Sequence, residues 1–406
     1  MSGNSNRLET WATRVVLLVA LVAAVIIALP TYMKATAAPL HPEPEKAPSV
    51  TWSSPSSRWS EAVRRSQRAM RTALTEQNLP GLSVAVGVGP DVVWSEGFGW
   101  ADIETHARVT PETRFRIGTA SNVLTSAAVG ALMEKDRLKL DQAIQAYVPQ
   151  FPKKKWPVTL RQVMAHTAGI PSDGGDEGPL FGQHCDRPVD ALPFFADRDL
   201  RFEPGTQYSY SRFGYILVSA AIEKAGDDPF VIFMQKHIFD PLGMNDTLPD
   251  SMTEPIPDRS ISYFPRFAGD PKYGPDVMRD LDLSCYSGSS IFLSTASDMV
   301  RFTLAIDNGK LLQPATVRQL QMSQELRSGE KTGYGLGWDL DEVKTSGGEP
   351  INVIGHDGDL LGGVAGSIVT VPSHGNVVVA VFSNTSYADT ALLAASIAEV
   401  FGHPKK

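Results

Sequence analysis

The sequence predicts an α+β fold in which one antiparallel sheet is built from both ends of the chain and flanked by helices. Three observations support this prediction. Strand-like segments occur near both ends of the chain, a helix-rich insert separates them, and an amphipathic helix precedes the first strand. We expect the terminal helices to cover one face of the sheet and the helix-rich insert to cover the other.

The predicted strands are short apolar runs bounded by turn residues. The first two are joined at Gly89-Pro90-Asp91, and the last two are joined by a hairpin loop at 372–375. The strands are expected at 82–88, 92–96, 334–340, 363–371 and 376–383.

The predicted helices show apolar residues at helical spacing, and several have recognisable ends. Residues 172–201 are different, because they are rich in Gly, Asp and Pro and show no period, which predicts a long loop. The helices are expected at 59–74, 122–135, 160–166, 213–225, 229–239, 297–308 and 390–401.

Residues 1–37 are predicted to be a signal peptide or a signal anchor. Residues 15–29 form an unbroken apolar run that follows Arg7 and Arg14, and Ala35-Thr36-Ala37 is a small-residue cleavage site. The run is short for a membrane span of roughly 20 residues, so we favour a cleaved signal. Either alternative exports the remainder to an extracytoplasmic compartment such as the periplasm, with membrane contact only through this segment.

The rest of the chain divides into a linker and one large domain. The Pro-rich residues 38–57 predict an extended linker, which leaves 58–406 as the globular domain. The net charge of −8, with no basic stripe, argues against a nucleic-acid partner. No spacing of ligands predicts a metal or another cofactor. Cys185 and Cys285 permit one disulfide in an oxidising compartment, with two separate buried thiols as the alternative.

Seven short motifs follow one another along the chain and carry a family resemblance. They are F-R-I-G from Phe115, H-T-A-G-I-P from His166, F-E-P-G-x-x-Y-x-Y-S from Phe202, F-D-P-L-G-M from Phe239, S-T-A-S-D-M from Ser294, Y-G-L-G-W from Tyr334 and G-H-D-G from Gly355. In this order they resemble the serine β-lactamase and penicillin-binding-protein superfamily, which includes class C β-lactamases, esterases and D-Ala-D-Ala peptidases. The resemblance extends from Trp59 almost to the C-terminus and implies a β-lactamase/transpeptidase-like fold.

The resemblance places an altered catalytic pair after F-R-I-G. Members of this superfamily carry S-x-x-K there, with a serine nucleophile and a lysine that takes its proton. This chain has Thr119 and Asn122 at those positions. A threonine hydroxyl can attack an acyl carbon, but a carboxamide cannot accept a proton, so the function of the lysine is lost. The simplest alternative role for Thr119 is a helix cap.

The resemblance also assigns a Y-x-N position, which here reads Tyr210-Ser211-Arg212. The tyrosine that moves protons is kept, whereas the asparagine that holds substrate is replaced by arginine. A cation has become an amide at Asn122 and an amide has become a cation at Arg212. We therefore hypothesise that the two roles were exchanged, with Arg212 holding a carboxylate ligand or favouring a tyrosinate at Tyr210.

The last motif implies an edge strand of the H-x-G type at His356, Asp357 and Gly358. His356 is expected to line the site, and Gly358 to let a substrate lie against the strand. The N–H of Asp359 would be an oxyanion donor by resemblance.

Three functional hypotheses remain open at this point. The first is a non-hydrolytic protein that binds a cell-wall peptide, another ligand with a carboxylate or acyl group, or a protein partner. The second is an acyl hydrolase that uses Thr119 as nucleophile and Tyr210 as base. The third is a structural envelope protein without a ligand. The oligomeric state is not predicted.

Overall fold

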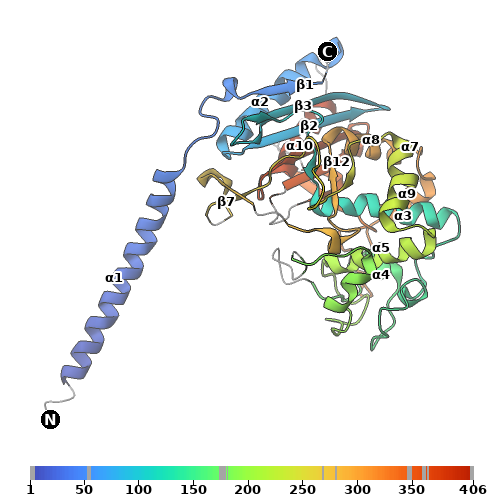
Figure 1. The fold of residues 1–406 in the computed structure, drawn as a ribbon, viewed down its shortest axis with the longest axis horizontal. Coiled ribbons are helices and arrows are strands. Elements are labelled where there is room, and N and C mark those ends of the chain that lie inside the picture. Colours follow the sequence, from blue (N-terminus) through green and yellow to red (C-terminus); the bar gives the residue numbers. More distant parts are fainter. Residues whose placement is uncertain are drawn as a thin grey trace.

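The computed structural model describes residues 5–52, 56–172, 180, 182–267, 269–278, 281–344, 350–358, 363 and 365–402. A long helix, α1 (Ser5–Thr36), extends away from a body in which a twisted sheet lies against helices (Figure 1). The two ends of the chain meet in this sheet, as predicted, because β2 pairs with β13 in antiparallel register, with Val84 opposite Val381.

All pairings in the main sheet are antiparallel, which confirms the predicted sheet type. Its order is β1 (Ser49–Thr51), β3 (Asp91–Asp102), β2 (Gly81–Val88), β13 (Val377–Ser383), β12 (Ala365–Val371), β11 (Pro350–Asp357) and β10 (Asp339–Lys344). Short strands form smaller groups at its margins: β4 (Ala107–Arg108) on β3, β5 (Phe115–Arg116) with β9 (Phe292–Ser294) and β6 (Leu248–Pro249), and β7 (Tyr263–Pro265) with β8 (Pro275–Val277).

The terminal helices α2 (Ser60–Glu76) and α10 (Thr390–Gly402) cover one face of the sheet. Val63, Met70 and Leu74 recur at helical spacing and are buried, so α2 presents one apolar stripe to the sheet. Alternate residues of β2, such as Leu82 and Val84, contribute to the same apolar cluster. This arrangement is the one that the sequence predicts.

Helix α8 (Ala296–Asp307) covers the opposite face and approaches the sheet closely. A Cβ atom at Gly87 of β2 would lie 2.7 Å from Val300 Cγ1, so the glycine allows this contact. Beyond α8 lie α3 (Ser121–Glu134) and α5 (Arg212–Gly226), both largely buried. The remaining helical segments are η1 (Pro44–Lys46), η2 (Ser57–Trp59), η3 (Gly118–Ala120), η4 (Ile144–Ala146), α4 (Leu160–Met164), η5 (Pro188–Phe194), α6 (Phe230–Met234), η6 (Gln235–Phe239), α7 (Asp240–Leu242), η7 (Pro271–Tyr273), η8 (Ser284–Tyr286), α9 (Pro314–Leu320) and η9 (Pro372–His374).

The structure differs from the prediction at the strand expected over 334–340. The strand begins only at Asp339, and Tyr334 makes a single bridge to it. Gly337 between them has a φ of +99°, which turns the chain where alternation alone suggested an extended strand.

The strand that carries His356 is also not an edge strand. It is β11, and β10 pairs outside it as far as Gly355, which lies opposite Asp339. Only His356 and Asp357, at the C-terminal end of β11, extend beyond this register.

The apolar N-terminal segment and the Pro-rich segment that follows it both contain regular secondary structure. Among the described residues, one helix is long and apolar enough to cross a membrane; this stretch, Thr13–Thr36, has a mean hydropathy of 2.7. Part of the Pro-rich segment, where we expected an extended linker, forms η1 and the strand β1. Residues 53–55 lie outside the described part.

The predicted loop at 172–201 contains η5 and is joined to η8 by a disulfide between Cys185 and Cys285. Residues 173–179 and 181 of this loop lie outside the described part of the chain.

Candidate active site

Thr119 lies in the one-turn helix η3, between β5 and α3, and is buried. Its hydroxyl donates a hydrogen bond to the main-chain oxygen of Asp357, at 3.0 Å. The cap position of α3 belongs to Ala120, and no side chain caps it. Thr119 therefore ties the start of α3 to the end of β11, and the alternative of a simple helix cap does not hold.

Asn122 is fully buried at the second position of α3, one turn after Thr119. Its Nδ2 atom lies 2.8 Å from the Tyr210 hydroxyl, 3.2 Å from His356 Nε2 and 3.4 Å from the Tyr334 hydroxyl. A carboxamide has two N–H donors, so these three acceptors compete for two hydrogens. Its Oδ1 atom has no hydrogen-bond partner among the described residues. Asn122 thus acts as a donor where the resembled family has a base.

Tyr210 lies just before α5, and its hydroxyl is close to both Thr119 and Asn122. Burial, and secondarily the carboxylate of Asp339, raises the pKa of its hydroxyl well above the ordinary value of 10.0, while hydrogen bonds with Thr119 and Asn122 act in the opposite direction. The net direction favours the neutral phenol. Tyr210 is therefore placed to contact the Thr119 hydroxyl but is a poor proton acceptor.

His356 faces Asn122 from the end of β11. Its Nδ1 atom lies 2.6 Å from the main-chain oxygen of Asp357, so Nδ1 carries the proton and donates there. Its Nε2 atom is then an acceptor, and the Tyr334 hydroxyl lies 3.0 Å from it. The carboxylate of Asp339 is 3.7 Å from Nδ1 on the outer side. The imidazole is thus held in one orientation from both nitrogens.

Gly358 is required by the packing between β11 and η3. A Cβ atom at this position would lie 2.1 Å from the main-chain oxygen of Ile117. We expected this glycine to admit a substrate, and the close approach of the two backbones gives a further reason for it. Asp359, the expected oxyanion donor, lies outside the described residues.

Arg212 is buried at the first position of α5. Its guanidinium carbon lies 5.5 Å from the ring centroid of Tyr286, which follows Cys285 in the chain. This contact joins Arg212 to the disulfide-linked segment. Asn122 instead contacts Tyr210, Tyr334 and His356, so the two altered positions have different described neighbours.

The site also contains two residues that we noted only as parts of motifs, His166 and Tyr334. The ring centroid of His166 lies 4.1 Å from that of Tyr210 and 4.8 Å from that of Tyr334. His166 Nδ1 accepts the N–H of Ser211 at 3.3 Å, so the proton lies on Nε2, which lacks a partner among the described residues. A single buried histidine or tyrosine in a sequence is usually a packing residue, and their position inside H-T-A-G-I-P and Y-G-L-G-W was the available signal.

The burial of His166 predicts that the protein loses stability in mild acid. Burial lowers the pKa of this imidazole well below 6.5, and the nearby His356 acts in the same direction. Between the lowered and the ordinary pKa, the unfolded chain binds a proton that the folded chain does not. The stability that the protein gains from keeping His166 neutral is therefore fully present above pH 6.5. It is lost as the pH falls from 6.5 towards the pKa of His166 in the folded protein.

The measurement is the thermal midpoint at about pH 7.5 and about pH 5 for wild type and for His166→Asn. Asparagine can accept the Ser211 N–H and tolerates the left-handed φ of +57° at this position. We expect a smaller loss of stability on acidification in the variant. An equal loss in both proteins would contradict this assignment.

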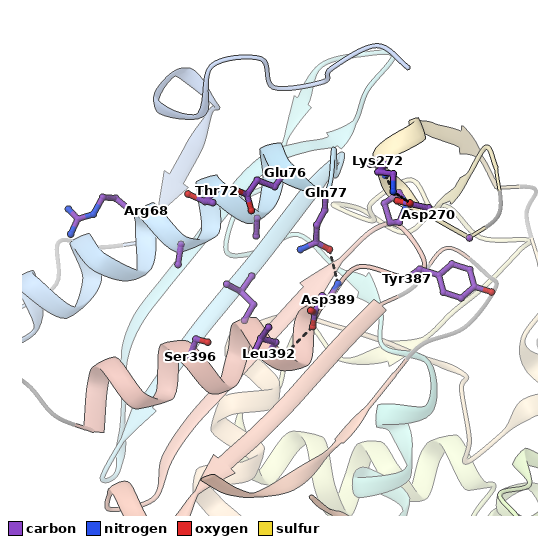
Figure 2. Close-up of a pocket in the computed structure, with 15 residues that line it drawn as sticks. Arg68, Thr72, Glu76, Gln77, Asp270, Lys272, Tyr387, Asp389, Leu392 and Ser396 are labelled. Carbon is purple, nitrogen blue, oxygen red and sulfur yellow. Dashed lines mark hydrogen bonds and ion pairs between the residues drawn. The ribbon is translucent and has the colours of Figure 1, made fainter. Parts of the chain in front are cut away.

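A separate hollow lies on the opposite face of the sheet. It has a volume of about 920 Å³ and lies between α2 and α10 (Figure 2). Its lining includes Arg68, Glu76, Lys272 and Tyr387, and it contains none of the site residues described above.

The sequence model of the Beta-lactamase family matches residues 66–401, which include every site residue described above. The chain belongs to the beta-lactamase family.

Two curated relatives share this family with the chain. The mitochondrial serine beta-lactamase-like protein LACTB of Mus musculus is 28% identical over 322 residues, covering 60% of this chain and 57% of that protein. The putative penicillin-binding protein PbpX of Bacillus subtilis (strain 168) is 26% identical over 265 residues, covering 65% and 63%. The match thus covers less than two thirds of either relative.

Solved structures confirm the beta-lactamase and penicillin-binding-protein fold. The octameric penicillin-binding protein homologue from Pyrococcus abyssi has a TM-score of 0.70 at 25% identity, covering 85% of this chain and 78% of that chain. A D-amino acid amidase from Ochrobactrum anthropi SV3, complexed with D-phenylalanine, has a TM-score of 0.65 at 20% identity, covering 83% and 97%. Within this beta-lactamase fold, the present chain carries Thr119 and Asn122 at the start of the helix α3.

Proposed function

We propose that this beta-lactamase family protein is exported and that its site binds the acyl or carboxyl end of a peptide or small ligand without efficient hydrolysis. The observation that carries the proposal is the buried amide of Asn122, whose Nδ2 atom contacts Tyr210 and His356. Acyl transfer by a hydroxyl needs a neighbouring group that takes its proton. An amide nitrogen donates and cannot do so.

The state of Thr119 supports the same proposal. Its hydroxyl donates to the main-chain oxygen of Asp357, which is not a base. Its other polar neighbour, Tyr210, has a raised pKa and favours the neutral form. Removing a general base costs about 10²–10⁴ in rate, so both features favour binding over turnover.

The ligand class follows from the polar groups around Asn122. The described groups in contact with it are two phenols and one imidazole, with the carboxylate of Asp339 behind His356. The Tyr210 hydroxyl accepts from Asn122 and keeps its own hydrogen, so as a neutral donor it suits a carbonyl or amide, and the nearby carboxylate disfavours a second negative charge at that point. We therefore assign the acyl carbonyl to the pocket around Thr119, and any carboxylate of the ligand to Arg212. The amidase bound to D-phenylalanine supports a ligand related to amino acids or peptides.

A second candidate function is an acyl hydrolase with Thr119 as the nucleophile and Tyr210 as the base. The proximity of Tyr210 to the Thr119 hydroxyl favours this function, but the hydroxyl would first have to release the hydrogen bond that it donates to the Asp357 carbonyl oxygen. This function also requires an anionic Tyr210 in a buried site, which the raised pKa makes costly.

Intact-mass spectrometry separates the two functions. The full chain is incubated with a fluorophosphonate and, separately, with a penicillin, and wild type is compared with Thr119→Ala. We expect no mass gain in either protein, with folding of both checked by thermal unfolding. A gain that occurs in wild type and is absent in Thr119→Ala would establish a threonine nucleophile and reject the non-hydrolytic function.

A further inference from the structure

The helix α1 is not only attached to the body by the chain but also contacts it through side chains. Arg266 donates to the carbonyl oxygen of Thr36 at 3.0 Å and to its hydroxyl at 3.3 Å. The last carbonyl groups of a helix lack partners within the helix, and a cation there is stabilising. The ring centroids of Tyr32 and Phe267 lie 6.3 Å apart, edge to face, and Met33 is buried.

Where α1 meets the body, residues of both form a compact aromatic and basic group, which we call the collar: Tyr32, Arg266, Phe267, Lys272 and Tyr273. Arg266 lies 5.0 Å from the Phe267 ring, and Lys272 lies 5.0 Å from the Tyr273 ring. The rings of Phe267 and Tyr273 are 6.5 Å apart, which continues the contact from Tyr32. Lys272 is also paired with Asp270, which moderates the positive charge of the collar.

The chain that follows α1 is fastened to the same place. Asn78, at the end of α2, accepts the N–H of Leu40 at 2.8 Å and donates to the carbonyl oxygen of Ala38 at 3.1 Å. Its amide also lies 3.5 Å from the carbonyl oxygen of Lys272. The buried His41 contacts the carbonyl oxygen of Pro80 at 3.1 Å. The collar and the chain on both sides of Ala37 are therefore one connected unit.

In a membrane crossed by α1, the length of this helix would place the collar at the bilayer surface. The apolar stretch has 24 residues, which at 1.5 Å per residue is about 36 Å, longer than a hydrocarbon core of ~30 Å. Tyr32 and Thr36 at its end therefore reach the polar boundary of the bilayer. Aromatic rings and basic side chains are the residue types that favour this boundary.

We propose that α1 is retained as an anchor and that the collar seats the body on the lipid headgroups of the membrane that α1 crosses. The proposal rests on the export proposed above and is independent of the chemistry at Asn122. It reverses our preference for cleavage after Ala37, because the folded body makes specific contacts with Thr36 and Tyr32 that a cleaved chain would lose. It also extends membrane contact beyond the N-terminal segment to Arg266, Phe267, Lys272 and Tyr273.

The seat would also fix which part of the body faces lipid. The short helix η7, which carries Lys272, contacts α1 on one side and borders the pocket between α2 and α10 on the other (Figure 2). The helix α9 lies on the side of the body away from α1 (Figure 1). A probe on β8, which directly follows η7, and a probe beyond α9 should therefore report very different distances from lipid.

The test uses the full chain in lipid nanodiscs with single-cysteine labels, since the two native cysteines are joined in a disulfide. Val277→Cys and Met322→Cys carry the same fluorophore, and both native residues are more than half exposed and lie outside the collar. Quenching by headgroup-attached nitroxide lipids is expected to be at least several-fold stronger at 277 than at 322. Adding Arg266→Ala to the Val277→Cys chain should reduce this quenching, and Arg266→Lys should largely preserve it.

Equal quenching at the two labelled positions would show that the collar does not face the lipid headgroups and would overturn this part of the proposal. Retention of α1 is tested separately by the intact mass of the protein recovered from cell membranes. A mature chain that begins at Ala38 would overturn the anchor. Neither result depends on whether Thr119 reacts with an acyl probe, so failure of this proposal is distinguishable from failure of the proposed pocket function.

Discussion

The triple variant Thr119→Ser, Asn122→Lys, Arg212→Asn is expected to hydrolyse small esters that the wild-type protein leaves intact. The side chain at 122 points at the Tyr210 hydroxyl and at His356 Nε2, from a fully buried position. A lysine amine placed among these groups would be shielded from water, which lowers its pKa and makes the neutral, proton-accepting form accessible. Serine at 119 would remove the methyl group that crowds the tetrahedral intermediate.

The expected gain is large because a positioned general base contributes about 10²–10⁴ in rate. The measurement is the initial rate of p-nitrophenyl ester hydrolysis by folded protein. The matched control is Thr119→Ser, Arg212→Asn, which keeps Asn122 and should remain near the wild-type rate. If the triple variant folds with an unchanged thermal midpoint and stays inactive, the pocket has diverged beyond these three positions.

This experiment relies on an arrangement of site residues and secondary structure that the sequence motifs predict well. The motifs at Phe115, Phe202 and Gly355 are far apart in the chain, yet each places its polar residue at the end or start of an ordered element. Thr119 follows β5, Tyr210 precedes α5 and His356 is the penultimate residue of β11. The structure brings these three and Asn122 into one hydrogen-bonded group, because the antiparallel sheet joins the two ends of the chain.

The sequence was less informative where local geometry depends on tertiary contacts. The strand expected from Tyr334 begins at Asp339, since Gly337 adopts a backbone conformation that alternation does not reveal. His166 and Tyr334 enter the site through ring contacts with Tyr210, which no spacing within the sequence specifies. The contact between Thr36 and Arg266 joins residues 230 positions apart, so composition alone could identify the apolar helix but not its docking.

The second large effect is expected on stability, from removal of the disulfide between Cys185 and Cys285. The two cysteines are separated by 100 positions, and closing a loop of that size stabilises a fold by roughly 4–5 kcal/mol in the chain-entropy model. Local hydrogen bonds remain after the bond is lost, including the one from the Cys185 N–H to Ser284 Oγ at 2.9 Å. We therefore expect a folded but much less stable protein.

The measurement is the urea midpoint of Cys185→Ala, Cys285→Ala compared with wild type, each with and without a reducing agent. Reduced wild type and the double variant should unfold at the same, lower midpoint, and the reducing agent should not affect the variant. Because Tyr286 adjoins Cys285 and its ring contacts Arg212, ligand affinity should fall together with stability. A disulfide found intact in protein taken directly from cells would also support export, since such bonds persist in oxidising compartments. An unchanged midpoint in the double variant would mean that other contacts hold the loop in place without the bond, and would contradict this prediction.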